Sequence, residues 1–111
     1  MIKEIFKTAQ EIKNERTPRD VFLHLTQEVG ELAEEVSILK GKAYKLGSND
    51  GIVGECIDVI LCAVDLIYVY RPETTEEELL EIVNGKLCKW KKLTSEEKEM
   101  IADKLAFELR D

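Results

Sequence analysis

The sequence predicts an all-helical fold, and three observations support this prediction. Apolar residues recur every three or four positions through most of the chain, which is the spacing of one face of an α-helix. Capping residues, prolines and glycines separate these periodic segments. No stretch alternates between apolar and polar residues for long enough to indicate a sheet. We therefore expect a bundle of about five helices, completed by oligomerisation.

The first helix is predicted over residues 2–15 and the second from Pro18 onward. Thr17 followed by Pro18 is typical of a helix start, because threonine caps free backbone N–H groups and proline suits the first helical position. Asp20 falls in the first turn, where it complements the helix dipole. The second helix has an apolar seam, which predicts packing against another helix. Its members are Phe22, Leu25, Val29, Leu32, Val36 and Leu39.

Residues 40–50 contain two glycines and interrupt the periodic pattern before the third helix. This helix is apolar over most of its circumference, so we expect it at the centre of the bundle. It should end at Arg71, because Pro72 disfavours helical geometry in the residue before it.

Two Thr-x-x-Glu patterns predict two further helix starts. Thr75 with Glu78 and Thr94 with Glu97 each have the spacing of a capping box, in which the two residues cap each other's backbone. We expect a fourth helix after Thr75 and an accessory fifth helix over residues 95–110. The whole chain, residues 1–111, is then one helical domain.

Composition restricts the function. A net charge of −7 over 111 residues argues against a nucleic-acid partner, since phosphate backbones attract basic surfaces. The N-terminal segment lacks the apolar region of a signal peptide. The longest apolar run, residues 59–70, contains Asp65 and is too short to span a membrane.

The cysteines also bear on the location of the protein. Cys56, Cys62 and Cys88 are odd in number and form no Cys-x-x-Cys pair, so they suggest neither a disulfide framework nor a thiolate zinc site. We interpret Cys56 and Cys62 as small core residues. A reducing cytoplasm is the expected location.

Four acidic residues stand out because they lie on helices with apolar seams. Glu28 and Glu31 are three residues apart, so they share one face of the second helix; Glu55 and Asp58 repeat this spacing on the third. Like charges within one turn repel each other, and burial raises the energetic cost. Oxygen ligands from two helices would suit a divalent cation such as magnesium. The alternative is that these are solvated acids, although the third helix has little polar surface.

The segments LTQEVGELAE at residues 25–34 and GECIDVI at residues 54–60 together resemble the MazG-like all-α nucleotide pyrophosphohydrolases. The resemblance covers roughly residues 20–93. It implies that the four acids bind Mg²⁺, with Mn²⁺ as a possible substitute. It also implies hydrolysis of a nucleoside or deoxynucleoside triphosphate between the α and β phosphates, and a homodimer or homotetramer.

The resemblance extends to NGKLCK at residues 84–89, where it implies that Lys86 and Lys89 contact substrate phosphates. A solvated helix end explains these lysines equally well. His24 lies one turn before Glu28 and could reach the mouth of the site, or it could be a surface histidine.

The chain departs from the family pattern at Gln27, where many members have a second acid beside Glu28. Another carboxylate would then have to orient the attacking water. Glu34, Glu35 and Asp65 are the candidates.

The sequence also bears on two alternative functions, a di-iron carboxylate protein and a non-catalytic helical module. A di-iron carboxylate bundle needs Glu-x-x-His pairs, and His24 is the chain's single histidine, so that function is excluded. A non-catalytic helical module for self-association or partner binding stays open as the alternative. The base of the substrate is not identified; Tyr44, Trp90 and His24 are the residues to compare with a base pocket.

Overall fold

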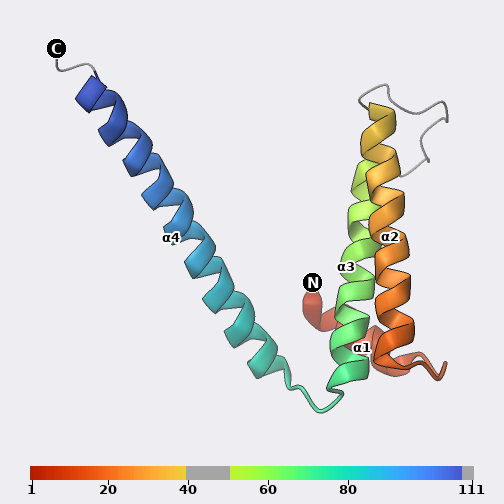
Figure 1. Cartoon of the computed structure of the whole chain (residues 1–111). Helices are drawn as coiled ribbons and strands as arrows, with labels where there is room; N and C mark the ends of the chain where they lie inside the picture. The colour runs from red at the N-terminus through yellow and green to blue at the C-terminus, as the bar shows by residue number, and fades with distance from the viewer. Residues whose placement is uncertain (40–50, 109–111) are drawn as a thin grey trace. The chain divides into compact units, whose positions relative to one another are not determined.

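The computed structural model describes residues 1–39 and 51–108, and within these ranges it contains four helices and no strands. They are α1 (Ile2–Glu11), α2 (Pro18–Leu39), α3 (Gly51–Tyr70) and α4 (Glu76–Glu108), shown in Figure 1. The all-helical prediction is therefore confirmed. None of the described helices is both long enough and apolar enough to cross a membrane.

The chain divides into two compact units, residues 1–74 with α1, α2 and α3, and residues 75–111 with α4. In the first unit, α2 and α3 run antiparallel side by side, and α1 packs against α3 (Figure 1). The single domain expected over residues 1–111 stays a prediction. The central position expected for α3 holds within the first unit, since α3 contacts both other helices.

The start of α2 is fixed by a reciprocal cap, as the sequence predicts. The Asp20 backbone N–H donates to Thr17 Oγ1 at 3.1 Å, and the Thr17 backbone N–H donates to Asp20 Oδ2 at 2.9 Å. Pro18 is the first helical residue. These bonds satisfy donors that a helix start otherwise leaves unpaired, and they lower the pKa of Asp20.

The apolar seam predicted for α2 is only partly covered. Phe22 and Val29 keep 52% and 47% of their surface exposed, whereas Val21, beside the predicted seam, is buried. The reason is that α3 is the main partner of α2 in this unit, and one helix covers only part of a broad apolar face.

Arg16, in the connection between α1 and α2, joins this connection to α3. Its guanidinium donates to both Asp65 carboxylate oxygens at 2.6–3.1 Å and to the Ala9 carbonyl oxygen at 3.0 Å. It also lies 5.6 Å from the Tyr68 ring centroid. The first helix is shorter than the expected residues 2–15, because the backbone becomes extended at Ile12, before the segment that places Arg16 against α3.

The second unit begins with the expected cap, since the Glu78 backbone N–H donates to Thr75 Oγ1 at 3.2 Å. The expected break at Thr94 is absent: α4 continues to Glu108 as one helix. No proline or glycine interrupts this part of α4, and a threonine or serine inside a helix costs less than about 1 kcal/mol. A local capping pattern therefore does not end the helix here.

Candidate metal centre

The antiparallel pairing of α2 and α3 brings three of the four predicted acids together. Glu28 and Glu31 lie one turn apart on α2, and Glu55 faces them from α3. One carboxylate oxygen from each lies within 4.8 Å of the other two. The helical spacing alone places Glu28 beside Glu31, but it is the packing of two helices that adds Glu55.

Two oxygen atoms of this carboxylate cluster (Glu28, Glu31 and Glu55) are buried without a hydrogen-bond partner among the described residues. Glu28 Oε2 and Glu55 Oε2 are both inaccessible to solvent and have no hydrogen-bond partner among the described residues. A buried carboxylate oxygen without a donor is unfavourable, because it loses its hydration and gains nothing in return. A cation between the helices would supply the missing partner, and oxygen donors are those that Mg²⁺ and Mn²⁺ prefer.

The electrostatics of the two acids agree with this geometry. Burial raises the pKa of Glu28, and the close Glu31 carboxyl group and the negative charge of Asp58 raise it further. The His24 side chain acts in the opposite direction. Burial also raises the pKa of Glu55, followed by the charges of Glu31, Asp58 and Glu28. Both acids thus resist ionisation unless a positive charge is close.

Asp58 lies at the edge of the carboxylate cluster. Within the described part of the chain it is not among the three acids whose oxygens come within 4.8 Å. Its charge nevertheless raises the pKa of Glu28 and of Glu55, and it lies one turn after Glu55 on α3. Of the four predicted ligands, Asp58 is the one supported only by the effect of its charge on the pKa of its neighbours.

Three residues were candidates to replace the second acid lost at Gln27. Asp65 is bound to Arg16, and Glu34 is exposed. Glu35 is half-buried, and its charge contributes to the raised pKa of Glu55. Gln27 itself is placed so that its Nε2 donates to Glu31 Oε1 at a long 3.5 Å. Glu35 is therefore the candidate whose charge acts on an acid of the cluster.

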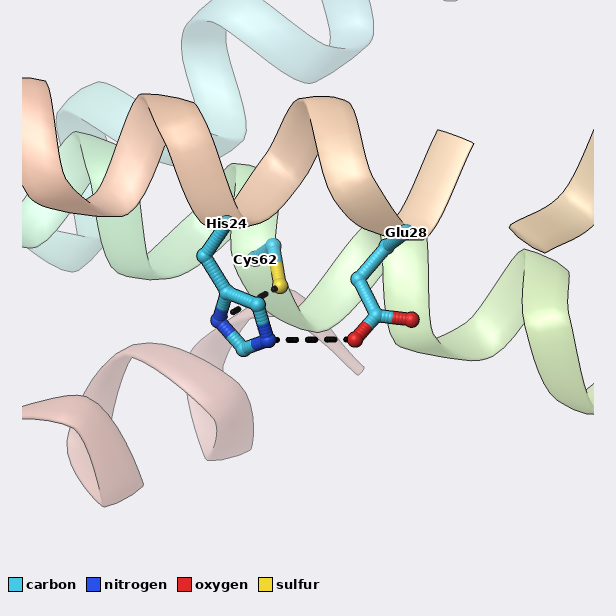
Figure 2. A group of neighbouring side chains, drawn as sticks. All are labelled: His24, Glu28 and Cys62. Atoms are coloured by element: carbon cyan, nitrogen blue, oxygen red, sulfur yellow. Dashed lines mark hydrogen bonds and ion pairs between the residues drawn. The ribbon is translucent and has the colours of Figure 1, made fainter. Parts of the chain in front are cut away.

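His24 contacts the carboxylate cluster through Glu28, as Figure 2 shows. Its Nε2 lies 3.1 Å from Glu28 Oε1, and its Nδ1 lies 3.6 Å from Cys62 Sγ on α3. The Glu28 side chain is 13% exposed and that of His24 59% exposed, so the histidine stands at the solvent side of the pair.

Cys62 is the residue of this group that the sequence did not assign to a site. It is buried, as expected of a core residue, but its sulfur faces His24 (Figure 2). Burial, followed by the charges of Glu28, Asp65 and Asp58, raises the pKa of the Cys62 thiol. The thiol is therefore a poor nucleophile at neutral pH. No sequence signal links two residues that are 38 positions apart and on different helices.

A pocket of about 330 Å³ adjoins His24 and Cys62 in the first unit. Its wall is largely apolar, with side chains mainly from α1 and α3, together with Ile12 after α1 and His24 from α2. The lining residues are Glu4, Ile5, Thr8, Ala9, Ile12, His24, Leu61, Cys62 and Asp65. The pocket therefore offers an apolar surface next to His24, the residue that is paired with Glu28.

The remaining predicted residues lie elsewhere. Lys86, Lys89 and Trp90 belong to α4 in the second unit, where each is exposed. Their contact with a substrate stays a prediction. Tyr44 lies outside the described residues.

Comparison of the chain with protein-family models, with curated proteins and with solved structures found no match in any of the three. The geometry of the site is a set of carboxylates with buried oxygens that lack partners, next to an apolar pocket.

Proposed function

We propose that this protein is a magnesium-dependent nucleotide pyrophosphohydrolase of the MazG-like kind, acting in the cytoplasm. The proposed reaction is hydrolysis of a nucleoside or deoxynucleoside triphosphate to the monophosphate and pyrophosphate. The observation that supports it most strongly is the carboxylate cluster, in which Glu28 Oε2 and Glu55 Oε2 are buried without hydrogen-bond partners. Such a cluster suits a cation that carries a polyphosphate.

In this proposal Glu28, Glu31 and Glu55 hold Mg²⁺, with Asp58 as the fourth ligand. The ion, when bound, neutralises phosphate charge and favours ionisation of a water molecule. Glu35 would orient the attacking water and take its proton, a role supported by the effect of its charge on the pKa of Glu55. The water oxygen forms a bond to the α phosphorus while the bond to the α–β bridging oxygen breaks, and pyrophosphate leaves.

The pocket beside His24 is the proposed place for the nucleoside. Ile5, Ala9 and Ile12 line it with apolar surface on which a base can lie, and Thr8 offers a hydroxyl group. His24 lines this pocket and its Nε2 lies 3.1 Å from Glu28 Oε1, so its ring would contact a nucleotide bound across both.

Exposed apolar residues on α3 support self-association. Val53, Ile57 and Leu61 are spaced four residues apart and keep 76%, 43% and 42% of their surface exposed, so they form a stripe along one face. We propose that a second copy of the chain covers this stripe in a homodimer or homotetramer. The same stripe is the observation that favours the alternative function, a non-catalytic module for assembly.

A panel of nucleoside and deoxynucleoside triphosphates, incubated with the protein and Mg²⁺, tests the proposal. Pyrophosphate and orthophosphate must be measured separately. We expect pyrophosphate from at least one nucleotide, and none when a chelator removes the metal. Orthophosphate as the first product would place cleavage at the terminal bond and contradict the proposal. No turnover of any nucleotide would favour the assembly module.

A further inference from the structure

His24, Glu28 and Cys62 form a group of three different ligand types, which we call the mixed-ligand triad. One nitrogen, one oxygen and one sulfur atom from these residues lie within 4.8 Å of one another. His24 and Glu28 are one turn apart on α2, and Cys62 faces them from α3 (Figure 2). We propose that the mixed-ligand triad binds a zinc-class transition-metal ion, at a site distinct in chemistry from the carboxylate cluster.

The donor atoms determine the class of ion. Imidazole nitrogen and thiolate sulfur select borderline ions such as Zn²⁺ and Co²⁺ over Mg²⁺, which prefers oxygen alone. Catalytic zinc sites use three protein ligands and one water, and tetrahedral geometry separates their ligand atoms by about 3.3–3.8 Å. The observed pairs, 3.1 Å from His24 Nε2 to Glu28 Oε1 and 3.6 Å from His24 Nδ1 to Cys62 Sγ, are close to this spacing.

The two contacts of His24 use opposite ring nitrogens, so one ion cannot be bound without a small rearrangement. The histidine side chain is 59% exposed, so core packing does not hold its ring in the observed orientation. His24 and Cys62 also line the same pocket of about 330 Å³, which gives an ion and its water ligand a way in. Binding would release the Cys62 thiol proton to solvent, and the ion would take its place.

Glu28 belongs both to the mixed-ligand triad and to the carboxylate cluster. An ion in the triad would therefore draw Glu28 away from the three-acid arrangement. This inference rests on the proposed function, and it predicts that Zn²⁺ inhibits nucleotide hydrolysis in the presence of excess Mg²⁺. The triad would then act as an inhibitory site whose occupancy follows the supply of transition metal.

Titration of the full-length, metal-free protein with Co²⁺ tests the proposal, because a thiolate ligand gives Co²⁺ a charge-transfer absorption that carboxylates do not give. We expect this absorption to saturate at one Co²⁺ per chain. The matched control is the double variant Cys56→Ser and Cys88→Ser, which keeps Cys62 and should keep the absorption. Cys62→Ala should abolish it, and circular dichroism checks that this variant is folded.

His24→Gln is the second variant, chosen because an exposed side chain can be changed without disturbing the core. It should weaken Co²⁺ binding by at least about tenfold. The proposal is overturned if wild-type protein shows no thiolate absorption, if the absorption survives Cys62→Ala, or if His24→Gln leaves the affinity unchanged. The readout needs no nucleotide, so its failure is distinguishable from failure of the proposed hydrolysis.

Discussion

Arg16 and Asp65 form a two-pronged ion pair across 49 residues of sequence, with Arg16 Nη2 lying 2.6 Å from Asp65 Oδ1. Their side chains are 12% and 23% exposed, so the pair is largely shielded from water. It fastens the connection between α1 and α2 to α3, the helix that carries Glu55. The pair therefore supports the site from one end of the three-helix unit, and it engages Asp65, one of the acids that the sequence suggested for orienting a water.

Asp65→Asn should lower the free energy of unfolding by about 1–3 kcal/mol, because hydrogen bonds to charged groups are lost and Arg16 keeps a poorly compensated charge. Denaturant unfolding measures this change. The matched control is Glu73→Gln, which breaks an exposed pair with Arg71 at 3.5 Å and should change stability by less than about 1 kcal/mol. Equal losses of unfolding free energy in the two variants would show that the Arg16–Asp65 pair stabilises the fold no more than an exposed ion pair does.

Two glycines in helices should respond to alanine in opposite directions. A Cβ atom at Gly30 would meet nothing within 4 Å among the described residues, so Gly30→Ala should stabilise the protein by about 0.5–1 kcal/mol through helix propensity. Gly51 has φ +60°, where a side chain is strained, so Gly51→Ala should destabilise by about 1–2 kcal/mol. Thermal unfolding of both variants checks the signs. A destabilising Gly30→Ala would show that another surface packs against this turn of α2.

Stability of the metal-free protein should depend on the raised pKa values of Glu28 and Glu55. Because the folded state holds these protons more tightly than the unfolded state, the two acids favour folding less and less as pH rises from their ordinary value of 4.5 through the raised values. The melting temperature should therefore be lower at about pH 8 than at about pH 5. Both values lie in the pH range where proteins are usually most stable. The double variant Glu28→Gln and Glu55→Gln should remove most of this difference, and an unchanged slope would contradict the assignment.

Magnesium should stabilise the folded protein, since only the folded chain brings the acids of α2 and α3 together. At a concentration about 100 times the dissociation constant the gain is about 2.7 kcal/mol, and a chelator should reverse it. The measurement is thermal unfolding with Mg²⁺, with the same ionic strength of a sodium salt as control. An equal gain from both salts would indicate charge screening without a specific site.

Local features of the fold were predictable because their causes lie within a few residues. Thr17 and Thr75 cap the helices that follow them, as their spacing to Asp20 and Glu78 indicates. The same kind of pattern at Thr94 was misleading, because a capping pattern competes with continued helix and nothing in the sequence there forbids the helix.

The candidate site was predictable to the extent that it depends on helical spacing. The acids of each helix share a face by periodicity, but the register that sets Glu55 against Glu28 is a property of packing. Long-range contacts are not indicated by helical spacing. Neither the Arg16–Asp65 pair nor the approach of Cys62 to His24 follows from it. Both arise when α3 is placed against residues far earlier in the chain.

The most direct test of the central claim is pyrophosphate release by Glu55→Gln, measured with Mg²⁺ and the best nucleotide of the panel beside wild-type protein and Glu81→Gln. Glu81 is an exposed acid on α4, so its variant controls for the loss of one negative charge. We predict that Glu81→Gln keeps wild-type turnover and that Glu55→Gln loses orders of magnitude while keeping its helical content, because a metal ligand is lost and charge repulsion is relieved. Wild-type turnover by a folded Glu55→Gln variant would contradict the claim that the carboxylate cluster is the catalytic metal centre.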